Sequence, residues 1–74
     1  MSRKIFMTFP QQILGEPLIY TLSRDFNIVP NIQGATITDE VGMMALLLEG
    51  EGGDIDRALE FLRSRGVMVE TVDG

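Results

Sequence analysis

The opening residues of the chain alternate between two sides with a period of two. Over residues 4–9 the odd-numbered positions are isoleucine, methionine and phenylalanine, whereas the even-numbered ones are lysine, phenylalanine and threonine. A period of two is typical of a β-strand, in which successive side chains point to opposite faces of a sheet. The pattern predicts a strand over residues 4–9 that is ended by Pro10.

Two later segments carry apolar residues at intervals of three and four, the period of an amphipathic α-helix. The first follows Gly15, has Pro17 where a first helical turn accepts proline, and ends near Asn27. The second has Asp54 as its predicted N-cap and Gly66 as its left-handed C-terminal residue. Their apolar stripes consist of Leu18, Ile19, Leu22 and Phe26 in the first helix and of Ile55, Ala58, Leu59 and Leu62 in the second.

Three further segments have the composition of strands. Residues 28–38 are rich in β-branched side chains, with Pro30 near the start, where its missing N–H does least damage to a strand ladder. Residues 43–48 are an unbroken apolar run between a turn at 39–42 and a loop with three glycines at 49–53. Residues 67–72 form the last predicted strand.

The resulting order, βαββαβ, predicts a ferredoxin-like α+β sandwich: a four-stranded antiparallel sheet with two helices on one face. We expect a single domain over residues 1–74, and so short a chain buries only about 60% of its unfolded surface. Small domains gain stability from disulfides, metals or self-association, and this chain has no cysteine and no histidine. Self-association is therefore the expected route to further burial.

The predicted sheet has more apolar residues than one covered face needs. If the odd-numbered residues of the first strand point to the helices, Phe6 points away from them, and Met68 and Val72 do the same in the last strand. In the run at 43–48, either the odd-numbered or the even-numbered residues point to the open face. Both choices add three apolar side chains to it. We expect this face to form a homodimer interface or a ligand surface, or else to be shielded by loops or the tail. The residues assigned to it are Phe6, Met43, Met44, Leu46 and Met68.

Composition argues against several functions. A net charge of −5, with 11 acidic residues and 6 scattered basic ones, does not attract nucleic acid. No apolar run approaches the roughly 20 residues that span a bilayer, and the first residues lack the apolar region of a secretory signal. The sequence therefore predicts a cytoplasmic protein without membrane insertion.

Candidate catalytic and metal-binding groups are sparse. Residues 49–56 hold four carboxylates, but not at the spacing of a calcium loop. The three serines have no histidine to activate them, and cysteine is absent. We expect no enzymatic activity, no metal site and no cofactor. If the protein recognises a small molecule, the first candidate is Asn31, although this residue could instead satisfy a backbone group at the strand entrance.

Several short strings, in this order and spacing, resemble the NIL domain family. These small ferredoxin-like modules occur at the C-terminus of the ATP-binding subunits of methionine-import ABC transporters, and beside ferredoxin segments in other proteins. The matching strings are Ile5 to Phe9, Glu16-Pro17-Leu18-Ile19, Asp25-Phe26, Asn31-Ile32-Gln33, Leu48-Glu49-Gly50, Ala58 to Leu62 and Gly66 to Glu70. Gln33 stands where the family writes an apolar residue.

The resemblance implies a regulatory domain that pairs with a second copy, binds methionine or a related amino acid, and acts on an ABC transporter ATP-binding subunit. By the same resemblance the ligand site comprises Asn31, Ile32 and Gln33. A side-chain amide both donates and accepts hydrogen bonds, which suits the carboxylate and ammonium groups of an amino acid. The alternative is an interaction module that binds no ligand and belongs to a ferredoxin-type or sulfur-assimilation protein; Gln33 favours this alternative.

Overall fold

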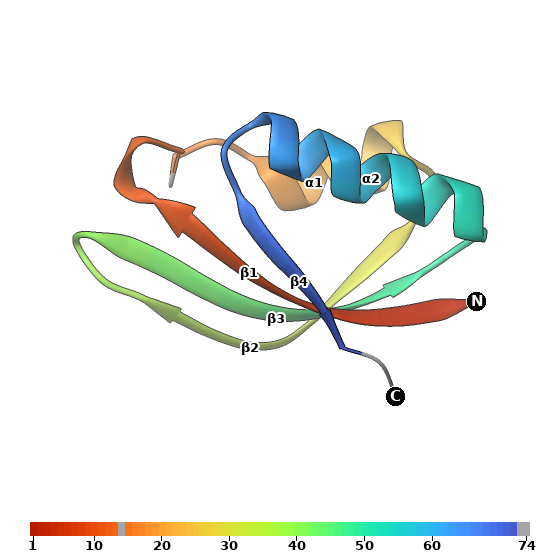
Figure 1. Ribbon diagram of the computed structural model, residues 1–74, viewed down its shortest axis with the longest axis horizontal. Helices are drawn as coiled ribbons and strands as arrows, with labels where there is room; N and C mark the ends of the chain where they lie inside the picture. Colours follow the sequence, from red (N-terminus) through yellow and green to blue (C-terminus); the bar gives the residue numbers. More distant parts are fainter. Residues whose placement is uncertain (14, 73–74) are drawn as a thin grey trace.

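The computed structural model describes residues 1–13 and 15–72, which form one four-stranded sheet with two helices on one side of it (Figure 1). The sheet order is β2-β3-β1-β4, and each neighbouring pair is antiparallel. The predicted ferredoxin-like βαββαβ fold is therefore confirmed. Its elements are β1 (Ser2–Pro10), the 3-10 turn η1 (Gln11–Ile13), α1 (Leu18–Asp25), β2 (Val29–Ile37), β3 (Val41–Glu49), α2 (Gly52–Ser64) and β4 (Met68–Val72).

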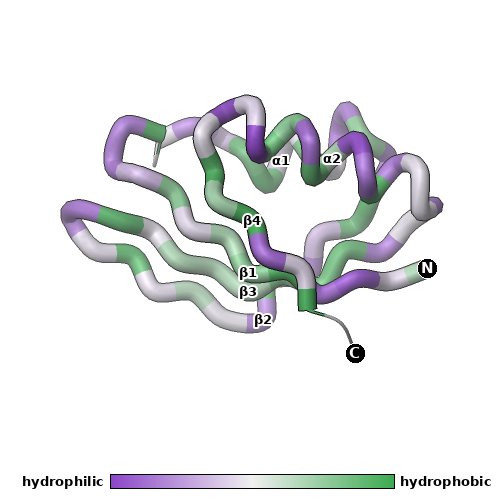
Figure 2. Tube along the Cα trace, viewed as in Figure 1, coloured by the Kyte–Doolittle hydropathy of each residue, from purple (hydrophilic) through white to green (hydrophobic). Residues whose placement is uncertain are grey.

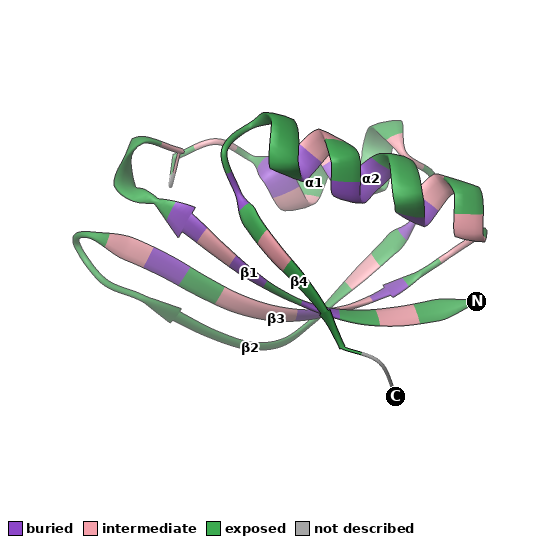
Figure 3. Cartoon of the chain, viewed as in Figure 1, coloured by how far each residue is buried: buried purple, intermediate pink, exposed green. Residues whose placement is uncertain are grey.

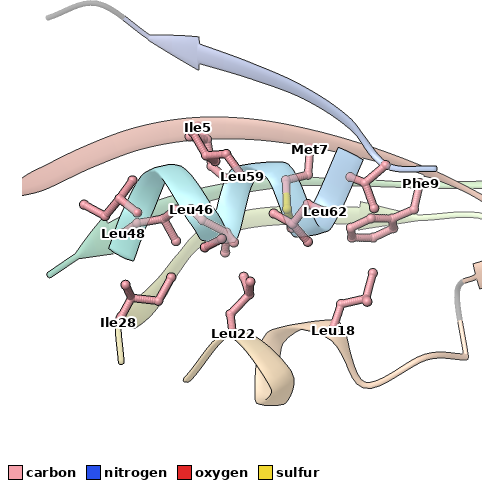
Figure 4. Close-up of a cluster of buried hydrophobic side chains, with 13 residues drawn as sticks. Ile5, Met7, Phe9, Leu18, Leu22, Ile28, Leu46, Leu48, Leu59 and Leu62 are labelled. Atoms are coloured by element: carbon pink, nitrogen blue, oxygen red, sulfur yellow. The ribbon is translucent and has the colours of Figure 1, made fainter. Parts of the chain in front are cut away.

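The core lies between the helices and the covered face of the sheet. Figure 4 shows Leu18 and Leu22 pointing from α1 toward side chains of β1 and β3, as the predicted stripe requires. Apolar and polar positions alternate along both helices in Figure 2. The buried apolar residues are Ile5, Met7, Phe9, Leu18, Leu22, Ile28, Leu46, Leu48, Ile55, Ala58, Leu59, Leu62 and Val67.

The start of α2 differs from the prediction. The helix begins at Gly52 with Glu51 as the N-cap, and Glu51 makes no side-chain capping bond. Asp54 is therefore not the N-cap but lies in the first turn, where a carboxylate is favoured by the helix dipole, and it pairs with Arg57. The prediction was wrong because it treated Gly52 as part of a flexible loop, whereas this glycine adopts helical conformation once α2 packs on the sheet.

Both helices end at a residue with left-handed backbone. Gly66 follows α2 with φ of +91°, as predicted, and Asn27 follows α1 with φ of +56°. Asparagine is one of the few non-glycine residues that tolerate this conformation. Asn27 thereby turns the chain from α1 into β2, which begins two residues later at Val29. The two helices also meet directly, with the rings of Phe26 and Phe61 5.1 Å apart.

Candidate functional site

The strand register decides which side chains lie on the open face of the sheet. Residues directly opposite each other in an antiparallel pair point to the same side. Ile5 is fully buried under the helices and lies opposite Leu46, so the next residue along, Phe6, points to the open face. Phe6 lies opposite Ala45 on β3 and Glu70 on β4.

Two residues assigned to the open face lie on the other side. Leu46 is fully buried, and Met44, opposite the buried Met7, packs against the core. The prediction was wrong for both residues, because a run that is apolar at every position does not show which alternate residues face the helices. Pairing with β1 sets that phase: Met43 stays on the open face, and Ala45 and Leu47 take the places there of Met44 and Leu46.

The open face carries a patch that we call the sulfur–aromatic patch, composed of Phe6, Met43 and Met68. Thr8 lies opposite Met43 on one neighbouring strand and Met68 on the other, so both thioethers flank it. The three patch residues are 46%, 53% and 67% exposed, respectively. Two shallow hollows of about 230 and 240 Å³, both lined by Phe6, occupy this face. Flexible methionine side chains beside an aromatic ring form an adaptable apolar surface.

Charged groups lie beside the sulfur–aromatic patch. The Lys4 ammonium is 5.6 Å from the centre of the Phe6 ring, a cation–π distance. Glu70, on the neighbouring strand β4, lies directly opposite Phe6. Glu49 lies on the same side of β3 as Leu47, opposite Ser2. The open face therefore combines an apolar centre with the Lys4 cation and the carboxylates of Glu49 and Glu70.

Asn31 lies on the open side of β2, opposite Leu47. Its amide Nδ2 donates to the backbone carbonyl of Leu47 over 3.4 Å, which is long for a hydrogen bond. Among the described residues this is the one hydrogen bond of the Asn31 side chain. Because the bond is long and the side chain is exposed, the amide retains capacity to bind another group.

The three residues of the predicted ligand site do not share one side of the sheet. Ile32 lies opposite Leu46 and therefore points to the helix side, away from Asn31. Gln33 lies at a register shift between Ile32 and Gly34, where β2 has one residue more than β3. Side chains of adjacent strand residues point to opposite faces of the sheet, so Asn31 faces the open side and Ile32 does not.

A groove that sequence reasoning missed runs between α1 and the start of β2. It encloses about 620 Å³ and is lined by Ile19, Tyr20, Ser23, Asn27, Ile28, Val29 and Pro30. Tyr20 is more than half exposed, and it lies outside the buried stripe of Leu18 and Leu22. A large aromatic residue off the core stripe of a helix was the signal for this groove in the sequence.

Over residues 1–13 and 15–72, no three histidine, cysteine or acidic side chains are grouped so as to hold a metal ion. The helices among these residues are too short or too polar to cross a bilayer.

A four-stranded antiparallel sheet, with two helices on one face and an apolar open face, defines this chain as a small ferredoxin-like α+β domain. More particularly, the NIL domain family model matches residues 4–71, and the chain belongs to that family. The resemblance identified from the sequence is thereby confirmed.

Proteins similar to this chain are methionine import ATP-binding proteins. MetN 1 of Bacillus cereus is 31% identical over 70 residues, which cover 89% of this chain and 20% of that protein. MetN of Ralstonia nicotianae is 43% identical over 53 residues, 66% of this chain and 14% of that protein. The chain thus spans about a fifth or less of the length of these curated relatives.

One solved structure has a closely similar fold. It is the C-terminal domain of an ABC transporter/ATP-binding protein from Enterococcus faecalis, which superimposes with a TM-score of 0.87 at 22% identity. The match covers 97% of this chain and 84% of that one. This likeness supports the fold over nearly the whole chain.

Proposed function

We propose that this protein is a non-catalytic, cytoplasmic regulatory domain for methionine import, which pairs through its open sheet face and binds methionine or a related amino acid beside Asn31. The similarity to methionine import ATP-binding proteins supports the transport context. The observation that carries the proposal is the sulfur–aromatic patch, Phe6, Met43 and Met68, on the same face of the sheet as Asn31.

The energetics of the patch favour covering it. Burying a whole large apolar side chain contributes about 1.5–3 kcal/mol, so a half-exposed one gains on the order of 1 kcal/mol when covered. Three such residues together gain on the order of 3 kcal/mol, which is large beside the roughly 5–15 kcal/mol stability of a whole domain. A second copy of the face covers the patch on both molecules at once.

The polar groups of this face suit an amino acid. Asn31 offers a donor for a carboxylate and an acceptor for an ammonium group. Leu47 of β3 lies between Asn31 on β2 and Lys4 on β1. Lys4 therefore provides a positive charge for the carboxylate of the amino acid. The apolar side chain of the ligand would then lie toward Phe6, which follows Lys4 by two residues on the same face.

The ligand is tested by calorimetric titration with L-methionine up to millimolar concentration. We expect heat with the unchanged protein, loss of that heat with Asn31→Ala, and retention of it with Thr36→Ala, a matched control on the open side of the same strand. No heat with the unchanged protein would reject amino-acid sensing and favour the ligand-free interaction module, which Gln33 also favours.

The pairing is tested separately by sedimentation equilibrium. Phe6→Glu places a second carboxylate beside Glu70 and should weaken association through the open face. Gln11→Glu adds the same charge at an exposed position of η1 and serves as the control. Equal association of the two variants would contradict pairing through the open face.

A further inference from the structure

The methionines of this chain are divided between the core and the surface. Met7 is 1% exposed, and Met44, directly opposite it, packs against the core. Met43 and Met68 lie on the open face, where both are more than half exposed, and Met1 is exposed at the start of the chain. Burial changes from one residue to the next along β1 and β3, as Figure 3 shows. Neighbouring methionines therefore differ sharply in their access to solvent.

The two open-face methionines lie on either side of one threonine. Thr8 is directly opposite Met43 on β3 and directly opposite Met68 on β4. Phe6 is diagonal to both methionines, a position within reach of long side chains. All of these residues line one hollow of about 230 Å³. A small solute that enters this hollow therefore meets both methionine side chains.

We propose that Met43 and Met68 form a redox-sensitive modification site, at which peroxide converts two thioethers to sulfoxides and makes the open face polar. At each methionine a sulfur lone pair attacks one oxygen of hydrogen peroxide, so that an S–O bond forms and the O–O bond breaks. The proton on the transferred oxygen passes to the departing hydroxide, which leaves as water. Sulfur loses two electrons, and one peroxide molecule is reduced at each methionine.

The residues around the two methionines accommodate an oxidised side chain. One row across the open face consists of Thr36 on β2, Met43 on β3, Thr8 on β1 and Met68 on β4. A sulfoxide oxygen accepts hydrogen bonds, and a threonine hydroxyl donates them. Each sulfoxide therefore has a donor beside it, whereas a sulfoxide at Met7 would lie among the apolar side chains of the core. We expect the oxidised open face to keep the fold intact.

Oxidation changes what can cover the sulfur–aromatic patch. An exposed sulfoxide is hydrated, and an apolar surface that covers it must remove that water without replacing its hydrogen bonds. Two such groups beside Phe6 turn an apolar centre into a polar one. The free energy that favours covering the reduced patch is thereby lost.

The regulatory meaning of the site rests on the proposed function, pairing through the open face in a regulator of methionine import. Sulfoxides at Met43 and Met68 weaken that pairing under oxidising conditions. Peroxide also oxidises the thioether of free methionine, so the domain responds to the same chemistry that consumes the amino acid. Methionine sulfoxide reductases reverse the modification, which makes the response a switch.

Peptide mapping after hydrogen peroxide treatment tests the selectivity at sub-micromolar protein concentration. Trypsin cleaves after lysine and arginine, which places Met7 and Met68 on separate peptides, and fragmentation distinguishes Met43 from Met44. We expect Met43 and Met68 to react at least tenfold faster than Met7 and several-fold faster than Met44, at rates similar to that of Met1. In urea the five rates should converge. A folded protein in which Met7 or Met44 reacts as fast as Met68 would overturn the proposal.

Hydrophobic-interaction chromatography tests the effect on the open face. We expect the oxidised protein to elute earlier than the untreated protein, with unchanged circular dichroism. The matched control is the variant Met43→Leu/Met68→Leu, which keeps the patch apolar and retains Met1, so it reports the effect of oxidation elsewhere. Unchanged elution of the oxidised wild type, an equal shift in the control variant, or unfolding on oxidation would each contradict the proposed site.

A second oxidation at high micromolar protein concentration separates this site from the pairing. If the open face pairs, Met43 and Met68 should react several-fold more slowly than at low concentration, while Met1 keeps its rate. Equal rates at both concentrations would reject the pairing, whereas the selectivity at low concentration decides the modification site. In sedimentation we expect at least tenfold weaker association of the oxidised protein and unchanged association of the peroxide-treated Met43→Leu/Met68→Leu variant. An oxidised wild type that associates as strongly as the untreated protein would overturn the switch.

Discussion

The replacement Gly66→Ala tests the backbone that ends α2. Gly66 has φ of +91°, and its N–H donates to the carbonyl of Arg63 at 3.1 Å. The N–H of Val67 donates to the carbonyl of Leu62 at 3.0 Å. Together these bonds form a Schellman motif, which satisfies carbonyls that the helix leaves without a partner. The same turn directs the chain into β4.

The magnitude follows from what surrounds Gly66. A Cβ atom added here meets no atom within 4 Å, so the substitution causes no clash. Its cost is therefore the left-handed backbone itself, roughly 1–2 kcal/mol for an L-residue. Alanine also restricts the unfolded chain, which offsets about 0.4–1 kcal/mol. We expect a net loss of about 1 kcal/mol, which corresponds to a fall in Tm of about 4–8 °C for a domain of this size.

Urea and thermal unfolding, followed by circular dichroism, measure this loss. Gly66→Asn should recover part of the stability, because asparagine tolerates positive φ and the chain itself uses Asn27 in this way after α1. Gly34→Ala is the control, since its added Cβ also meets nothing within 4 Å and its φ lies outside the left-handed region. The reasoning is refuted if the alanine variants at 66 and 34 have the same stability.

Three further predictions concern the core, a close backbone contact and an ion pair. Leu22→Ala removes a fully buried side chain and should lower the free energy of unfolding by about 2–5 kcal/mol in urea titrations; a loss below 1 kcal/mol would contradict its place in the core. Gly50→Ala should cost about 1–3 kcal/mol, because the new Cβ would lie 2.9 Å from Cγ2 of Ile28, and unchanged stability would contradict that contact. The hydrogen bond from Arg24 lowers the pKa of Asp25, so carbon-13 NMR should detect its carboxyl titrating below the usual range of an aspartate, and Arg24→Gln should raise that pKa. Because the folded pKa is the lower one, any stabilisation from this pair is present at neutral pH and is lost as the pH falls through the folded pKa.

Much of the fold could be predicted from local patterns. The alternation at residues 4–9 and the helical stripes through Leu22 and Leu59 required only the side-chain periods of strand and helix, and the structure confirms both. Gly66 could be predicted because left-handed helix ends select glycine. The start of α2 could not be predicted in this way, since Gly52 fits either a loop or a first helical turn.

The candidate site could be predicted only in part. Phe6 and Met68 belong to strands with clear alternation, so their side of the sheet followed from the sequence. Met44 and Leu46 lie in a run that is apolar on both sides, and nothing local distinguishes its two phases. The α1–β2 groove combines residues from two elements, so it required the packing of α1 against β2.

The sequence by itself determined the order of the elements, the apolar stripe of each helix and the acidic composition of the chain. These properties depend on neighbouring residues and their periodicity. Only the tertiary structure decided which side of β3 faces the helices, that Asn31 and Ile32 point to opposite sides, and that two methionines flank Thr8 on the open face. Those properties depend on strand register. Residues distant in the sequence fix the register, which is why no local pattern contains them.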